Sequence, residues 1–269
     1  MKRALGMTLL ISAGLLGWGT RRASVASSPR SVGESGRIPV LVELFTSEGC
    51  SSCPPADALL AKLEGQQPFA SAEIIGLEEH VDYWDNLGWR DPFSSASWTA
   101  RQYAYAGALG NGNAYTPQMV VDGREEFVGS NTGKARQAIE QASGTNKMRV
   151  QLSDISIREQ ALTLKIAVDK PGNLTPGDTA EVLLAITERG LHSAVTRGEN
   201  AGEDLHHASV LRELRSVGLA GKNGGQVFTT QPPIKLDRGW NRGSLRVVVF
   251  VQEKKSRHVL GASSAALGQ

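Results

Sequence analysis

The chain contains two cysteines, Cys50 and Cys53, and their setting strongly constrains the local structure. They follow an apolar, β-branched run at residues 39–45, which is typical of a buried parallel strand. They precede Pro54 and Pro55, which a first helical turn tolerates because its N–H groups have no partner within the helix. The sequence therefore predicts a strand, a turn that holds both cysteines, and a helix.

The spacing of the two cysteines favours chemistry over structural support. A disulfide between residues three apart closes a very small ring, so it restrains the unfolded chain little. Two thiols beside a helix N-terminus suit reversible disulfide exchange, because the helix dipole and free backbone N–H groups stabilise a thiolate. A structural metal half-site or an inert pair is the alternative that Cys-x-x-Cys spacing leaves open.

The N-terminus has the pattern of an export signal. Basic residues 2–3 precede an apolar run at residues 4–19, and residues 24–26 (Ser-Val-Ala) offer a cleavage site. The run is shorter than the ~20 residues of a membrane-spanning helix, although Arg21 and Arg22 leave an uncleaved anchor as the alternative. We expect a periplasmic or secreted protein with residues 1–26 as its signal, and not an integral membrane protein if the signal is cleaved.

Charge and compartment narrow the function classes. Without residues 1–26 the chain keeps 25 Lys and Arg against 27 Asp and Glu, a formal charge of −2. This balance gives no support to nucleic-acid binding, which needs a clustered basic face. Oxidising compartments permit disulfides, and a small exported domain that used them structurally would carry several, widely spaced.

The texture of the sequence changes near residue 146, which predicts two units after a linker at 27–37. Residues 38–145 read β-α-β-α-β-β-α, with a hairpin signal at Asp122 and Gly123. The aromatic segment 82–93 is expected to pack onto the core, with a cleft lining as the alternative. Residues 146–269 alternate as half-buried strands and predict an antiparallel sandwich.

One segment of the second half fits that scheme poorly. Residues 198–214 read as a long connection plus one strand. Within them, the adjacent His206 and His207 cannot both point into one site from a strand, and we interpret them as structural or surface residues.

The first unit resembles a thioredoxin-like fold, through the strand at 40–45, the Cys-x-x-Cys helix start, Thr116-Pro117 before a strand, and the terminal hairpin and helix. The resemblance implies that Cys50 is the nucleophile, Cys53 the resolving thiol and Pro117 a cis-proline facing them. It also implies the fold class, a thioredoxin-like α/β domain followed by a mainly antiparallel β (sandwich-like) domain.

A narrower resemblance covers nearly the whole mature chain. Residues 45–57 (FTSEGCSSCPPAD), 80–85 (HVDYWD), 115–123 (YTPQMVVDG), 198–200 (GEN) and 205–207 (LHH) look like an exported bacterial thioredoxin-like family catalogued as a domain of unknown function. The resemblance implies a chemistry but identifies no substrate. Ser51 and Ser52 stand where thioredoxins have Gly-Pro.

Three further residues are candidates for acid–base roles. Glu43 lies near the place of the buried acid that thioredoxins keep on the first strand, but its spacing differs by one residue, which moves a side chain to the other face. Otherwise it is a strand-end residue. His80 and Asp82 end the second strand, where open α/β sheets place their sites. We expect His80 and Asp82 to act in acid–base catalysis or to provide a metal ligand. The alternative is a structural pair that anchors the aromatic segment.

Three functions compete on the sequence alone. The leading hypothesis is a thiol–disulfide oxidoreductase that acts on an exported protein or small-thiol substrate with an unidentified redox partner and no cofactor. The second is a Cu(I) or Zn(II) carrier or sensor, with Cys50, Cys53 and His80 as ligands. The third is a non-enzymatic binding module, since one fold hosts unrelated functions.

Overall fold

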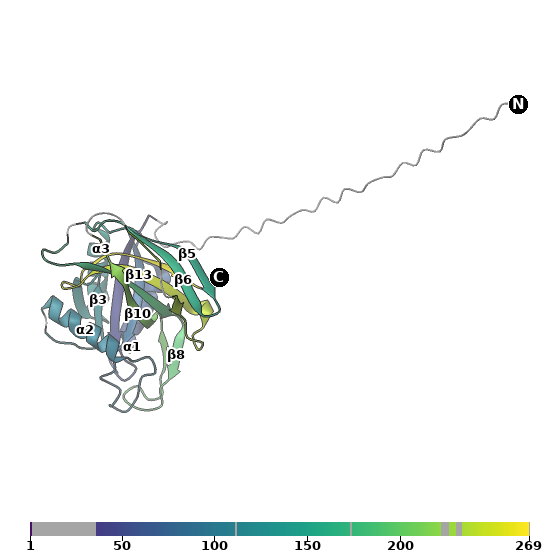
Figure 1. Ribbon diagram of the computed structural model, residues 1–269. Coiled ribbons are helices and arrows are strands. Elements are labelled where there is room, and N and C mark those ends of the chain that lie inside the picture. Colours follow the sequence, from purple (N-terminus) through teal and green to yellow (C-terminus); the bar gives the residue numbers. More distant parts are fainter. Residues whose placement is uncertain (2–35, 111, 173, 222–225, 230–232, 269) are drawn as a thin grey trace.

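The computed structural model describes residues 1, 36–110, 112–172, 174–221, 226–229 and 233–268 (Figure 1). The predicted export signal beyond its first residue, and residues 27–35 of the predicted linker, lie outside this range. None of the helices in the described residues is long and apolar enough to cross a membrane.

The first half alternates strands and helices in the order that the sequence predicts. The elements are β1 (Ile38–Thr46), α1 (Pro54–Gln66), β2 (Ala72–His80), α2 (Ala96–Leu109), β3 (Gln118–Val121), β4 (Glu125–Val128) and α3 (Thr132–Ser143).

The second half is built of strands. They are β5 (Val150–Arg158), β6 (Ala161–Val168), β7 (Ala180–Glu188), β8 (Leu191–Ala194), β9 (Asp204–His207), β10 (Val210–Leu219), β11 (Gln226–Thr229), β12 (Ile234–Lys235), β13 (Leu245–Glu253) and β14 (Val259–Ala266). A short 3-10 helix, Arg242–Ser244, precedes β13.

Eight strands form one mixed sheet that runs through both halves, in the order β14-β13-β7-β10-β2-β1-β3-β4. Strand β10 joins the two groups, because it pairs antiparallel with β7 and parallel with β2 at Val210 and Glu78. The predicted fold class, a thioredoxin-like α/β domain followed by a sandwich-like β domain, is therefore wrong. The chain is mainly β, with a large mixed sheet shared by its two halves.

The halves share this sheet because each covers apolar surface of the other. Leu41 and Leu77 of the first half pack in one core with Leu183 and Phe250 of the second half. Without β10, strand β2 would also present an edge of unpaired N–H and C=O groups. Sequence periodicity finds the strands but carries no signal for pairing between distant ones, so the continuous sheet was missed.

Strand β1 is covered on both faces, which explains its nearly unbroken apolar sequence. Val40, Val42 and Leu44 belong to the core formed with α1 and α3. Leu41 points to the opposite face, where Trp98 of α2 and the second half pack. A second sheet, formed by β5, β6, β11 and β12, packs over β7 and β13.

A buried polar cluster on the α2 face ties the halves together. Arg101 of α2 donates from Nε to the Glu43 carboxylate at 2.7 Å and from Nη1 to the Gln252 side-chain oxygen of β13 at 3.1 Å. Tyr105 donates to the same Glu43 carboxylate and accepts from Gln252 Nε2 at 2.7 Å. A full guanidinium charge thus compensates the buried carboxylate.

We predict that Gly123→Ala destabilises the fold. Gly123 has φ +63°, and a Cβ at this position would lie 1.9 Å from the carbonyl oxygen of Arg257 in the second half. Backbone strain and overlap together should lower the free energy of unfolding by at least about 2 kcal/mol. Urea denaturation followed by circular dichroism measures the change.

Gly107→Ala is the matched control, because Gly107 is an exposed α2 residue whose added Cβ would meet nothing within 4 Å. It should stabilise the chain by up to ~1 kcal/mol. Equal midpoints for the two variants would contradict the strain argument.

Candidate functional site

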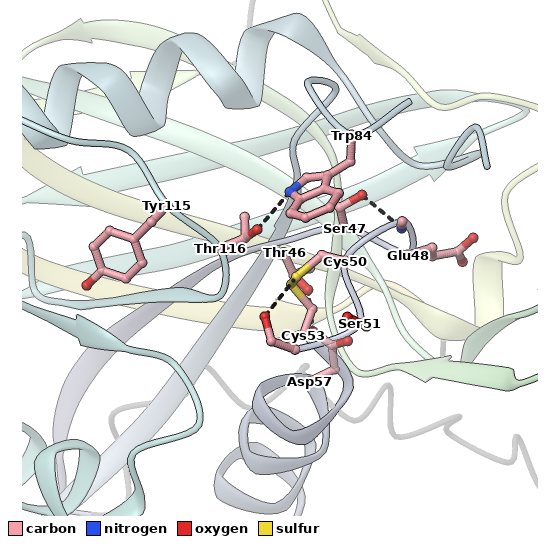
Figure 2. The surroundings of a disulfide bond; sticks show 12 residues. Thr46, Ser47, Glu48, Cys50, Ser51, Cys53, Asp57, Trp84, Tyr115 and Thr116 are labelled. Carbon is pink, nitrogen blue, oxygen red and sulfur yellow. Dashed lines mark hydrogen bonds between the residues drawn. A yellow bond between two sulfur atoms is a disulfide. The ribbon is translucent and has the colours of Figure 1, made fainter. Parts of the chain in front are cut away.

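Cys50 and Cys53 form a disulfide in the turn between β1 and α1, which we call the cysteine loop (residues 47–53) (Figure 2). Both residues are fully buried. The Cys50 sulfur lies 3.3 Å from the Ser52 hydroxyl. Because Pro54 and Pro55 carry no N–H, this hydroxyl replaces part of the hydrogen bonding that a helix N-terminus usually offers a thiolate.

A buried carboxyl group lies one helical turn after Cys53. Cys53 has helical backbone angles, and its carbonyl oxygen accepts a hydrogen bond from the Asp57 amide at 3.1 Å. Residues four apart in a helix share a face, so the Cys53 and Asp57 side chains lie on the same side of α1. Asp57 Oδ1 accepts a 2.6 Å hydrogen bond from Thr46 at the end of β1.

The surroundings of Asp57 bring its pKa close to neutral pH. Burial and then the Glu78 charge raise the pKa of Asp57 from 3.8 to about 7. His207, the Thr46 hydrogen bond and His80 oppose these effects only in part. A carboxyl group with such a pKa can accept or donate a proton at physiological pH.

The second half covers the cysteine loop with residues 198–200. Asn200 Nδ2 donates to the carbonyl oxygens of Glu48 at 2.8 Å and Cys50 at 3.1 Å. The Glu199 carboxylate accepts from the amide and hydroxyl of Ser51 at 3.1 and 2.7 Å. This segment belongs to the connection that the sequence could not assign, and it ties the second half to the backbone of the cysteine loop.

The Thr116–Pro117 peptide bond is cis, as the resemblance implied. Trp84 Nε1 donates to the Thr116 hydroxyl at 2.8 Å, and a Cβ at Gly49 would lie 3.1 Å from Trp84 Cβ. Trp84 therefore connects Thr116 to the cysteine loop. Figure 2 shows the disulfide between Trp84 on one side and Asp57 on the other.

Five ionisable side chains lie buried next to the cysteine loop, and we call them the histidine–carboxylate cluster: Glu48, Glu78, His80, Asp91 and His207. His207 Nδ1 lies 2.7 Å from Glu78 Oε1, and its Nε2 lies 3.1 Å from Glu48 Oε1. His80 Nδ1 lies 2.7 Å from Asp91 Oδ2. The two imidazole rings touch at a centroid distance of 4.6 Å.

In this cluster, the attraction between the histidines and the carboxylates shifts the pKa values more than burial does. Burial lowers the pKa of His80, but the Asp91 and Glu78 carboxylates leave it well above the usual value. Burial likewise lowers the pKa of His207, yet Glu48 and Glu78 raise it to about 9. Burial raises the pKa of Glu78, but the two histidines bring it below its usual range.

The other predicted acid–base residues lie elsewhere. Glu43 points to the α2 face, opposite the face that holds Thr46 and α1, and it is paired with Arg101. Asp82 does not join His80, because its amide and carboxylate both bond the Thr99 hydroxyl at 3.1 and 2.6 Å. Of the three predicted residues, only His80 contributes to the cluster beside the cysteine loop.

Sequence reasoning missed most of the residues that surround the disulfide: Glu48, Asp57, Glu78, Asp91, Glu199, Asn200 and His207. A signal was available for His207, because strand alternation places it on the face of the apolar Leu205, and both are buried whereas His206 is exposed. For Asp57, the (i, i+4) spacing from Cys53 was the available signal. The aromatic segment packs only in part: Phe93 contacts both imidazole rings and Trp84 packs against a small core, whereas Tyr83 is exposed.

We predict that Asn200→Ala accelerates reduction of the disulfide by a small phosphine. The variant removes two hydrogen bonds that hold residues 198–200 over the cysteine loop. At about 1 kcal/mol each, their loss should raise the rate by about 30-fold. Alkylation of acid-quenched samples, followed by intact mass, gives the rate.

Gln141→Ala, which removes an exposed amide on α3, is the control and should leave the rate unchanged. Denaturation midpoints of both variants separate local opening from global unfolding. An unchanged rate in Asn200→Ala would mean that residues 198–200 do not control access.

We predict that Asp57→Asn stabilises the disulfide form at pH 8 and much less at pH 4. Between its unfolded pKa near 3.8 and its folded pKa of about 7, Asp57 binds a proton only in the folded state. Wild-type stability therefore falls as pH rises through this window. The variant escapes this loss, on the order of 2–4 kcal/mol.

Urea denaturation at both pH values tests this, with Thr46→Val as a variant that removes only the hydrogen bond to Asp57. A stability difference between wild type and Asp57→Asn that is the same at pH 4 and pH 8 would show that Asp57 is ionised throughout.

Comparison with known proteins finds matches over most of the chain. A structural-genomics protein from Agrobacterium tumefaciens matches 87% of this chain and 96% of its own, with 27% sequence identity and a TM-score of 0.65. HBP35 of Porphyromonas gingivalis matches 86% of this chain and 76% of its own, with a TM-score of 0.63, and at 18% identity it shows the fold alone. Both matches span the two halves together. No match was found among the curated proteins.

The family model described as "Protein of unknown function (DUF1223)" matches residues 41–252. This description states neither a thioredoxin-like character nor a reaction. As the sequence motifs predicted, the chain therefore belongs to a family of unknown function, the DUF1223 family.

Proposed function

We propose that Cys50 and Cys53 form a reversible dithiol–disulfide pair that exchanges electrons with a thiol or disulfide substrate outside the cytoplasm. The observation that carries the proposal is the buried Asp57 carboxyl group on the Cys53 face of α1, with a pKa of about 7. A structural disulfide needs no such proton acceptor. The ring of a three-residue spacing also adds little to stability.

The exchange has a balanced sequence of steps in the reducing direction. The Cys50 thiolate attacks a substrate disulfide, forms a mixed disulfide and releases one substrate thiolate, which takes up a proton. Cys53 then transfers its proton to the Asp57 carboxylate and attacks the Cys50 sulfur, which releases the second substrate thiolate, and that thiolate also takes up a proton. The protein is oxidised by two electrons and the substrate is reduced by two; the reverse sequence makes the protein an oxidant.

The surroundings support different roles for the two cysteines. The Ser52 hydroxyl beside the Cys50 sulfur stabilises a thiolate there, which suits the nucleophile. Cys53 shares its face with Asp57, which suits the resolving thiol. Thr116 and Pro117 lie close to the cysteine loop and to α1. Trp84 donates to the Thr116 hydroxyl, and a Cβ on Gly129 would contact both Ala56 of α1 and Pro117.

Access to the sulfur atoms requires a local opening in this proposal. Both cysteines are fully buried, whereas Ser51, Ser52 and Glu199 are exposed. Displacement of residues 198–200 breaks four hydrogen bonds to the cysteine loop. A substrate that offers backbone or carboxylate groups to Ser51 would replace part of that bonding.

The metal-carrier alternative loses its cysteine ligands here. In the described part of the chain, the group of at least three metal-ligating side chains that lie close together consists of Glu78, His80 and His207. It holds no cysteine, and the two sulfurs are bonded to each other. A binding module with inert cysteines remains the competing proposal, and the redox measurement distinguishes the two.

We predict a reversible two-electron transition of the pair between roughly −120 and −270 mV, the range of thiol oxidoreductases. Equilibration with glutathione or dithiothreitol buffers, followed by alkylation and intact mass, measures it. Cys50→Ser should abolish reduction of a model protein disulfide. Asp57→Asn should slow release of the mixed disulfide and remove its rate change near pH 7.

Lys134→Gln, an exposed change on α3, is the control and should leave the potential and the rates unaltered. A pair that stayed oxidised far below about −300 mV would instead identify a structural disulfide. Full exchange activity in Cys50→Ser would also sink the proposal.

A further inference from the structure

The histidine–carboxylate cluster contains the elements of a metal site that the redox proposal does not use. His80 Nε2 is fully buried and has no hydrogen-bond partner, and its nearest acidic oxygen is Glu78 Oε1 at 3.6 Å. One ligand atom each from Glu78, His80 and His207 lie within 4.8 Å of one another. We propose that these three side chains bind a divalent transition-metal ion, with Zn²⁺ as the representative cation.

The donor set and its spacing suit such an ion. Two imidazoles and one carboxylate form one of the common ligand sets of zinc sites, with a fourth position for water or substrate. Bonds of about 2.0–2.2 Å in tetrahedral geometry place ligand atoms about 3.3–3.5 Å apart. The separation of His80 Nε2 and Glu78 Oε1 is already close to this value, and His207 Nδ1 needs to move about 0.6 Å away from Glu78 Oε1.

Each ligand is held by a second partner, as metal ligands usually are. His80 Nδ1 faces Asp91 Oδ2 at 2.7 Å, which leaves its Nε2 free for the ion. His207 Nε2 faces Glu48 Oε1 at 3.1 Å, so the ion would replace only the 2.7 Å contact between His207 Nδ1 and Glu78 Oε1. The second Glu78 oxygen accepts a 2.8 Å hydrogen bond from the Ala208 amide.

The supporting carboxylates are themselves oriented. Glu48 accepts from Trp89 Nε1 at 2.7 Å, and Asp91 accepts from the Glu48 amide at 2.8 Å. Phe93 contacts both rings and closes the apolar side of the cluster. The ring orientations are therefore fixed before any ion arrives, which lowers the cost of binding it.

The charge balance favours a cation at this place. Glu48, Glu78 and Asp91 bring three carboxylates into the interior, and no Lys or Arg forms an ion pair with them in the part of the chain that the structure describes. On the other face of the sheet, Arg101 supplies a permanent charge to Glu43. In the histidine–carboxylate cluster, the negative charge is compensated either by two protons on the imidazoles or by one divalent ion. Binding of the ion releases those protons.

A surface pocket approaches the cluster. A pocket of about 440 Å³ is lined by Ala61 and Glu64 of α1, by Arg246 of β13 and by Ala208. Ala208 also supplies the amide that binds Glu78. The lining of the pocket therefore meets the cluster at Ala208, and the three proposed ligands themselves are buried.

The test uses the mature chain with its disulfide intact. The protein is stripped with a chelator, dialysed against Zn²⁺, and analysed by elemental mass spectrometry and by competition with a chromophoric chelator. We expect one Zn²⁺ per chain. His80→Gln and His207→Gln should each weaken Zn²⁺ binding by about 100-fold or more.

The chain offers a matched control in its exposed histidine pair. The rings of His192 and His206 stack at 5.4 Å beside Asp204 on the surface. The double variant His192→Gln/His206→Gln should keep the full affinity. Loss of Zn²⁺ binding in this double variant, or no retained Zn²⁺ in the wild type, would overturn the proposal.

X-ray absorption of the Zn²⁺-loaded wild type covers the case in which the cluster variants fail to fold. Nitrogen and oxygen neighbours with imidazole scattering support the site, and a sulfur neighbour overturns it. Cys50→Ser/Cys53→Ser should bind Zn²⁺ with unchanged affinity. The proposal therefore stands or falls independently of the redox chemistry of the cysteines.

Discussion

The compensation of charge buried at the carboxyl ends of β1 and β2 governs the rest of the architecture. Glu43, Glu48 and Glu78 lie in the interior, where an unpaired carboxylate would be very costly. Glu48 and Glu78 take part of their compensation from His207 of the second half, whereas Glu43 is paired with Arg101 and Tyr105 of α2 within the first half. Gln252 of the second half bonds Arg101 and Tyr105. Contact between the halves is thus an electrostatic requirement as well as a hydrophobic one.

The two faces of the sheet solve this problem in different ways. On the α2 face, Arg101 and Tyr105 enclose Glu43 with groups that keep their protonation state across the physiological range. On the α1 face, the compensating groups are imidazoles, whose positive charge can be replaced by that of a bound cation. Adjustable chemistry is concentrated on the face that carries the disulfide and Asp57, while the opposite face serves stability.

Sequence patterns predicted the parts of this protein that local chemistry determines. The strand, cysteine loop and helix around Cys50, the cis bond at Pro117 and the order of elements up to residue 144 all follow from apolar periodicity, proline positions and a family resemblance. The fold class was wrong because the β10–β2 contact joins residues more than a hundred positions apart. The site was incomplete for the same reason, since Asn200 and His207 lie in a segment without clear periodicity. Glu43 was considered because thioredoxins keep a buried acid on the first strand, whereas the face that Cys53 and Asp57 share on α1 was not considered.

The contacts that cover the disulfide have a consequence for the order of events during biogenesis. Glu199 and Asn200 bond to residues about 150 positions earlier in the chain. Contacts of such long sequence separation form late in folding, because their loop-closure entropy must be met first. The cysteines are therefore an open pair in the folding chain before the second half closes over them. The redox state set in that interval is the one that the finished protein retains until residues 198–200 open.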